Sequence, residues 1–282
     1  MEKAYKYRIY PNEKQKEIIA KTFGCCRFVY NKYLAQRIEL YQTSKESLSY
    51  VKCAKEMSEL KNELEWLTEV DSTALQSSLK DLDNAYKKFF KEHAGFPNFK
   101  SKKTHRYSYK SKCVNDNIKY LGGCIKLPKL GLVKTKNKLT PQGRIVNATA
   151  SQEPSGKYYV SLCCVDVEIQ PLPTTGNAVG IDLGIKEFCI TSDGELVNNP
   201  KYLKNSLNKL AKLQRELSRK PKGSSNRNKA RIKVARLYEK ISNQRKDFLQ
   251  KLSTNIIREN DVICIEDLQV KNMVKNHKLA QA

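Results

Sequence analysis

Two short apolar stretches that each carry an acid place the strongest limit on how this chain can fold. Residues 179–186 (VGIDLGIK) have Asp182 at their centre. Residues 262–268 (VICIEDL) end in Glu266, Asp267 and a leucine. Apolar runs of this length and composition predict strands. Because an ionised carboxylate in a buried strand is costly unless a cation lies against it, the pattern indicates a cation site.

Strand alternation assigns each acid to a face. Asp182 shares its face with Gly180 and Gly184, which leaves room for a metal ion and a phosphate group. Glu266 and Asp267 lie on opposite faces, so they are not expected to share a metal. If the two strands meet, Asp182 and Glu266 form a divalent-metal site of the kind that cuts phosphodiesters. The alternatives are an Asp182 paired with a lysine at a strand edge and a Glu266 that only ends its strand.

The charge of the chain points to nucleic acid as its partner. Among 282 residues there are 53 Lys+Arg against 29 Asp+Glu, a net charge of +24. Such an excess repels itself unless a polyanion neutralises it. No apolar run reaches the roughly 18 residues of a membrane span and no signal peptide opens the chain, so we expect a cytoplasmic protein with no membrane partner. A basic fold of the ribosomal type is the alternative.

The nine cysteines form no C-x-x-C pair, and most stand among apolar residues. They are predicted to be small buried residues of a reduced protein rather than a disulfide framework or a zinc site. The three histidines, His93, His105 and His277, are isolated and suggest neither a base nor a ligand.

The hydropathy pattern predicts helices in the first third of the chain and strands in the second. Residues 4–10 alternate as a strand, and residues 12–92 are largely helical, with a capping box at Asn12–Gln15. Turns and short β-like runs continue to about residue 170 and predict a small barrel that the first strand joins. The predicted runs are 107–109, 118–120, 125–127, 145–148 and 158–165. A linker, 171–176, leads into the last part.

The last part is predicted to hold a hairpin and two basic helices. A mate for the Asp182 strand follows at 188–192, and the helices cover about 201–219 and 226–258. Between residues 201 and 258 there are 18 Lys+Arg against three acids. This bias is too one-sided for a merely soluble surface, where charges of both signs mix, so we expect these helices to bind phosphate.

Several basic and aromatic side chains are candidates for contact with nucleic acid. Tyrosines that stand beside basic residues either stack on unpaired bases or pack on a strand face, and the sequence leaves both open. The candidates are Tyr7, Arg8, Arg27, Lys100, Lys102, Lys103, Arg227, Lys229 and Arg231.

The order of these motifs resembles the TnpB (OrfB) family of transposase proteins encoded by insertion sequences, compact relatives of the type V CRISPR effectors. The resemblance extends over essentially the whole chain. It is carried by residues 7–11 (YRIYP), 22–31 (TFGCCRFVYN), 95–103 (GFPNFKSKK), 180–184 (GIDLG), 226–231 (NRNKAR) and 262–267 (VICIED).

The resemblance implies an α+β multidomain protein. Residues 1–10 and 93–172 would form a wedge-type β-barrel, 11–92 an inserted helical recognition domain, and 173–282 an incomplete RuvC-like nuclease domain of RNase H fold. It also implies a bacterial, nucleoid-associated, RNA-guided DNA endonuclease. Its partners would be a guide RNA from the transposon end and a double-stranded target DNA that is identified by base pairing. Asp182 and Glu266 match two of the three acids that hold two Mg²⁺ ions in that family.

The family continues into a zinc ribbon with paired C-x-x-C motifs and a third catalytic Asp. This sequence stops at Ala282 and contains no zinc ligands of that kind. We therefore expect a truncated chain with impaired cutting, and a catalytically inactive guide-RNA- or DNA-binding remnant or repressor is the alternative. An actin-like ATPase, whose phosphate loop residues 180–184 also resemble, is a third reading. It is disfavoured because Ile185 stands where Thr or Ser is usual and no Gly-rich adenosine segment follows.

Overall fold

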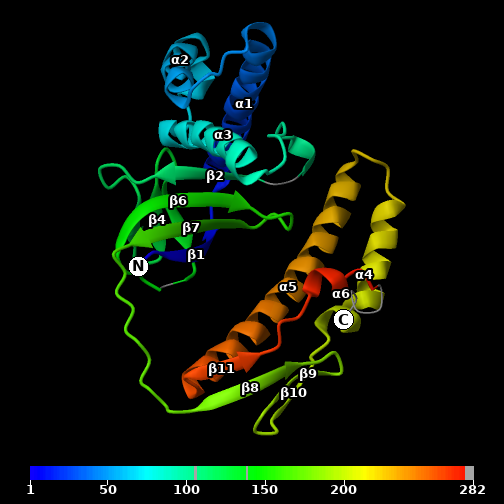
Figure 1. The fold of residues 1–282 in the computed structure, drawn as a ribbon. Coiled ribbons are helices and arrows are strands. Elements are labelled where there is room, and N and C mark those ends of the chain that lie inside the picture. The colour runs from blue at the N-terminus through cyan, green and yellow to red at the C-terminus, as the bar shows by residue number, and fades with distance from the viewer. Residues whose placement is uncertain (105–106, 138, 277–282) are drawn as a thin grey trace. The chain divides into compact units, whose positions relative to one another are not determined.

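The computed structural model describes residues 1–104, 107–137 and 139–276, so His105, His277 and the last residues up to Ala282 lie outside the described residues. The chain divides into two compact units, Met1–Ile169 and Gln170–Ala282. Each unit combines strands with helices (Figure 1), which confirms the mixed α and β class.

The first unit is built on a seven-stranded antiparallel sheet of order β2-β6-β7-β1-β5-β4-β3. Strand β1 pairs with both β7 and β5, so the first strand joins the later strands as predicted. Tyr5, Tyr7 and Ile9 of β1 point into the core. The strands are β1 (Lys3–Tyr10), β2 (Tyr107–Lys112), β3 (Lys119–Leu121), β4 (Cys124–Leu127), β5 (Gly131–Thr135), β6 (Arg144–Gln152) and β7 (Tyr158–Val165).

Strand β5 is the element of this sheet that the hydropathy pattern did not predict. It forms a hairpin with β4, in which Leu127 pairs with Gly131. Lys129 and Gly131 both adopt positive φ in the tight turn of this hairpin. Strand β5 contains only two apolar side chains, so its sequence shows no clear alternation of apolar and polar residues. The closure of the sheet into a barrel stays a prediction.

Three helices are inserted between β1 and β2: α1 (Glu13–Ser44), α2 (Tyr50–Glu63) and α3 (Ser72–Glu92), with short 3₁₀ turns η1 (Glu65–Leu67) and η2 (Lys102–Thr104). The predicted capping box begins α1: the Gln15 amide donates to the Asn12 side chain and the Asn12 amide donates to the Gln15 side chain. Helix α3 packs against both α1 and β2, and the buried residues of helices and sheet form one core.

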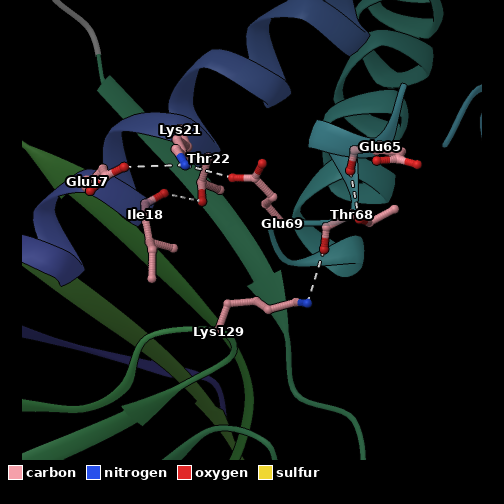
Figure 2. A network of polar contacts seen from close by, with 8 residues as sticks. All are labelled: Glu17, Ile18, Lys21, Thr22, Glu65, Thr68, Glu69 and Lys129. Atoms are coloured by element: carbon pink, nitrogen blue, oxygen red, sulfur yellow. Dashed lines mark hydrogen bonds and ion pairs between the residues drawn. The ribbon is translucent and has the colours of Figure 1, made fainter. Parts of the chain in front are cut away.

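A network of polar contacts joins α1 to the turn before α3 (Figure 2). The Lys21 ammonium lies 3.3 Å from the carboxylate of Glu17 and 2.7 Å from that of Glu69. Lys129, from the β4–β5 hairpin, donates to the carbonyl of Thr68 at 3.1 Å. Because these ion pairs are exposed, water and salt screen them, and the network contributes little to stability.

The second unit contains a four-stranded sheet of order β10-β9-β8-β11. Its strands are β8 (Ala178–Leu183), β9 (Glu187–Thr191), β10 (Leu196–Asn198) and β11 (Val262–Ile265). The predicted hairpin between β8 and β9 is confirmed, and β10 adds a strand that was not predicted. Strand β11 is parallel to β8, and a short helix α6 (Val270–Met273) follows it.

Two long helices, α4 (Tyr202–Ser218) and α5 (Ser225–Glu259), connect β10 to β11 and pack on each other (Figure 1). Both were predicted within a few residues of their observed ends. Their shared core is small: Leu210 of α4 meets Val234, Leu237 and Ile241 of α5. Among the described residues, no helix combines the length and the apolar composition that a membrane crossing requires.

The cysteines are free thiols, and eight of the nine are buried or partly buried. Burial raises the pKa of Cys26 to about 12, so this thiol stays protonated at neutral pH. Cys264 is the exception to the predicted burial, because it lies on the exposed edge strand β11.

Candidate metal centre

The parallel pairing of β8 with β11 brings the two candidate acids together. Val262 pairs with Ala178 and Ile265 with Ile181, a constant offset of 84 residues. The residue after Ile265 is Glu266, and the residue after Ile181 is Asp182, so the same offset relates the two acids. Because residues in parallel register project to the same side, the two carboxylates lie next to each other at the carboxyl ends of adjacent strands.

Both acids line the same hollow, which measures about 440 Å³. It is lined by β8, by β11 with the residue that follows it, and by the end of β9. The residues that line it are Gly180, Ile181, Asp182, Ile190, Thr191, Ser192, Cys264, Ile265 and Glu266. Asp267 is not among these, in agreement with the alternation of the strand. The distance along the sequence between the two acids is large, so only the sheet topology creates this site.

The acids are exposed, which corrects one premise of the sequence argument. Asp182 and Glu266 are both solvent-accessible, and all four residues of β11 are exposed, including Ile265 at 68%. Because successive residues of β11 point to opposite faces and all are exposed, no described part of the chain covers either face of the sheet at this strand. The cost of burying a charge therefore does not demand a cation here, and the case for the site rests on the shared position of two oxygen donors.

The two glycines that flank Asp182 have different roles. A Cβ on Gly184 would lie 2.8 Å from the carbonyl oxygen of Glu187. Gly184 is therefore needed for the tight turn into β9 and does not make room for a ligand. A Cβ on Gly180 would meet the Ser192 side chain at 3.5 Å, an ordinary contact. The Gly180 amide donates to the Ser192 hydroxyl at 3.1 Å. Gly180 lines the hollow and Gly184 does not, so of the two glycines Gly180 leaves the expected room beside Asp182.

Asp261 sets the alignment of β8, and the sequence did not reveal it. Its carboxylate accepts hydrogen bonds from the amide of Thr175, at 3.1 and 3.0 Å, and from that of Gly176 at 2.7 Å. These bonds lower the pKa of Asp261. The amide of Asp261 donates in turn to the carbonyl of Asn177. The residues before β8 are thus tied to the residue before β11, which fixes the register that aligns the two acids.

The described residues contain no group of three or more His, Cys, Asp or Glu side chains placed to hold one metal ion. The hollow therefore offers two carboxylates. Mg²⁺ is commonly bound in proteins by one or two carboxylates, with water and substrate phosphates as the remaining ligands. The donor set fits Mg²⁺ in this mode.

The candidate nucleic-acid residues of the second unit differ in availability. The Arg227 guanidinium is partly buried and donates to the carbonyls of Leu217 and Lys220, at 2.9 and 2.8 Å, so it caps the end of α4. Lys229 is exposed and Arg231 is partly buried. The structure thus gives Arg227 a structural role, and the contact of these residues with nucleic acid stays a prediction.

The candidates of the first unit are also divided. Tyr7 is 1% exposed, stacks on Tyr120 at 5.4 Å and donates to the carbonyl of Leu139, so no face of its ring is open to a base. Burial raises its pKa to about 12. Arg8 lies over the ring of Tyr10, and the Lys100 ammonium lies 4.0 Å from the ring centre of Tyr30. The remaining candidates are the partly buried Arg27 and the exposed Lys102 and Lys103.

Comparison with known proteins identifies the family. Residues 161–277 match the OrfB family of IS605, described as a probable transposase, and residues 1–46 match a domain described as helix-turn-helix. In this structure residues 1–46 hold strand β1 and the single long helix α1. A putative RNA-guided DNA endonuclease of Streptomyces pristinaespiralis is 40% identical over all of this chain and 71% of its own length. This chain belongs to the TnpB/OrfB family.

A second relative agrees with that assignment. The putative RNA-guided DNA endonuclease InsQ of Escherichia coli K12 is 36% identical, over 97% of this chain and 68% of its own length. A solved CRISPR-Cas12f ternary complex has a chain that is 12% identical, with a TM-score of 0.41 over 92% of this chain and 64% of that chain.

Proposed function

We propose that this chain is an RNA-guided, Mg²⁺-dependent DNA endonuclease of a bacterial insertion sequence. The observation that carries the proposal is the parallel pairing of β8 with β11, which puts Asp182 and Glu266 in one hollow. The membership of the family supports it, because its relatives are named putative RNA-guided DNA endonucleases. In this proposal residues 173–282 belong to an incomplete RuvC-like nuclease domain and residues 1–10 and 93–172 to a wedge domain. Residues 11–92, which hold helices α1 to α3, form an inserted recognition domain.

The proposed roles of the residues follow from their positions. Asp182 and Glu266 supply oxygen ligands for Mg²⁺, which when bound would activate the attacking water and stabilise the leaving oxygen of a phosphodiester. Gly180 carries no side chain into the hollow, so a phosphate backbone can approach both acids. Asp261 holds the two strands in the register that keeps the acids side by side.

The proposed partners are a guide RNA that is transcribed from the transposon end and a double-stranded target DNA. The basic helices α4 and α5 are the second unit's phosphate-binding surface in this proposal. Residues 201–258, which span nearly all of both helices, contain 18 Lys+Arg against three acids, and this bias supports the proposal. So does the exposure of Lys229, Lys233, Arg236 and Lys240.

A binding protein without cutting activity is the second candidate. It is favoured by the finding that only two carboxylates line the hollow, with no group of three metal-binding side chains in the described part of the chain. Such a protein would hold guide RNA and DNA and would act as a repressor.

A cleavage assay separates the two. The chain is incubated with guide RNA, Mg²⁺ and a plasmid that carries the target, and linear product is measured beside retardation of the same DNA. The endonuclease proposal predicts cutting that Asp182→Ala and Glu266→Gln abolish, while both variants still bind RNA. Asp267→Asn is the matched control, because it neutralises the adjacent acid outside the hollow, and it should cut like the unaltered chain. Retardation without any cutting favours the binding protein.

A further inference from the structure

An exposed cluster of aromatic rings ends helix α3 in the first unit. Tyr86, Phe89 and Phe90 from the helix and Phe96 from the loop after it form this aromatic cluster. Four ring pairs close it, with centroids 5.0 to 6.3 Å apart. Tyr86 packs on the core, whereas Phe90 is 71% exposed and Phe96 45%. Rings that contact one another this closely and still face water are costly to leave uncovered.

A side chain of α1, Arg37, packs against the ring of Tyr86. The Arg37 guanidinium lies 5.1 Å from the ring centre of Tyr86 and is paired with Asp83 at 3.5 Å. Arg37 is almost fully buried, at 9% side-chain exposure. A cation that is fixed against the ring face keeps the Tyr86 side chain, on which the other rings pack, in one orientation.

The loop that carries Phe96 is clamped as well. The side chain of Asn31 donates to the carbonyl of Lys100 and accepts from its amide, at 2.9 and 2.8 Å. The Lys100 ammonium rests on the ring of Tyr30, and Pro97 is buried. Since the loop after α3 is held at Pro97 and Lys100, it has less conformational freedom to lose when a ligand binds.

The segment that carries the aromatic cluster is strongly basic, and Asp83, one turn earlier on α3, is paired with Arg37 and Lys87. Residues 86–103 contain six lysines and one acid, Glu92. Lys88, Lys91, Lys102 and Lys103 are exposed. A protein partner with only an apolar face would leave these lysines without an anionic partner, whereas a polyanion that carries flat aromatic groups matches both features. Unpaired nucleic-acid bases stack on such rings, and the phosphates that join them meet the lysines.

We propose that the aromatic cluster is a stacking platform for unpaired bases of the guide RNA. The choice of RNA rests on the proposed function, in which the guide is the partner with unpaired bases before any target is found. Phe90 and Phe96 offer the open rings, Tyr86 and Phe89 support them, and the lysines contact the flanking phosphates. No sequence readout is required, because every base has a face to stack.

The test measures the affinity of the full chain for a fluorescein-labelled 20-nucleotide oligouridine RNA by anisotropy, beside oligothymidine DNA of equal length and a blunt RNA duplex. Phe90→Ala should weaken the binding of the single-stranded RNA about five- to hundredfold and leave duplex binding unchanged. Phe90→Leu, which keeps the apolar surface and loses the ring, should weaken it as much. Phe90→Tyr should bind like the unaltered chain. Tyr41→Ala, an aromatic side chain that is 59% exposed on α1, is the control and should change nothing.

Salt dependence gives a second readout. Phe90→Ala should leave the slope of log affinity against log salt unchanged, and Lys88→Gln should reduce it by about 0.7, the value for one phosphate on a single strand. Full binding by Phe90→Leu overturns the stacking platform in favour of apolar docking, and full binding by Phe90→Ala overturns it outright. A loss confined to the DNA probe overturns the assignment to RNA. Unaltered chain that binds no RNA overturns the proposed function, which the other outcomes leave standing.

Discussion

The two sheets of this molecule use their strands in opposite ways. In the seven-stranded sheet, alternate side chains of β1 and β7 are buried, and Tyr7, Val160 and Leu162 are almost inaccessible to solvent. In the four-stranded sheet, every residue of β11 is exposed. The first sheet thus holds the core of its unit, whereas the second aligns two acids at a surface. Burial explains stability in one and strand register explains the candidate site in the other.

Truncation of a core residue in each sheet tests this difference with the largest expected effect. Leu162→Ala, in β7, should lower the free energy of unfolding by about 2–5 kcal/mol, because a fully buried leucine leaves a cavity. Ile265→Ala, in β11, should change it by less than about 0.5 kcal/mol. Urea denaturation followed by circular dichroism measures both. Equal losses would contradict the contrast between the sheets.

The glycines beside Asp182 give the next largest effect. Gly184→Ala should cost about 1–3 kcal/mol, because its methyl group would overlap the Glu187 carbonyl. Gly180→Ala should leave stability nearly unchanged, since its nearest neighbour is at an ordinary distance, yet it should reduce cutting because the methyl group enters the hollow. Thermal melts and the cleavage assay together separate the turn residue from the site residue. A Gly180→Ala chain that cuts normally would argue that the hollow is not where the substrate lies.

Arg227 should contribute a smaller stabilisation within the helical pair. Arg227→Met removes the guanidinium that caps α4 and should cost about 1–2 kcal/mol. Lys229→Met, on the exposed side of the same turn of α5, is the control and should be close to neutral. Hydrogen exchange at the last turn of α4 reports the loss locally. Unchanged protection there would mean that water replaces the cap without cost.

The smallest effect concerns Asp261 and depends on pH. Its folded pKa lies below the ordinary value, so the stabilisation that it provides is present above the unfolded pKa and is lost as pH falls through the folded pKa. Asp261→Asn should remove that part of the acid sensitivity, and the difference between variant and unaltered chain should vanish below the folded pKa. Urea midpoints between pH 7 and pH 3 measure it. A difference that is independent of pH would show that the carboxylate charge does not matter.

Periodicity predicted most helices and strands of this chain, because their apolar faces repeat cleanly, as in α1 and β7. It missed β5 and β10, which carry few apolar residues and are defined by the hairpins that they close. Asp182 and Glu266 could be named from sequence because each interrupts an apolar run. Their exposure could not, since it depends on whether other parts of the chain cover the faces of the sheet. The capping role of Arg227 and the clamp by Asp261 depend on backbone groups far along the chain, which no local pattern reveals.

A double-mutant cycle on metal binding tests the central claim most directly. Mn²⁺ binding to the full chain is measured by electron paramagnetic resonance for the unaltered chain, Asp182→Asn, Glu266→Gln and the double variant. If both acids hold the same ion, each single substitution removes the tight site and the double variant binds no more weakly than either one. Losses that add independently, or tight binding that survives the double substitution, would contradict a shared metal centre between β8 and β11.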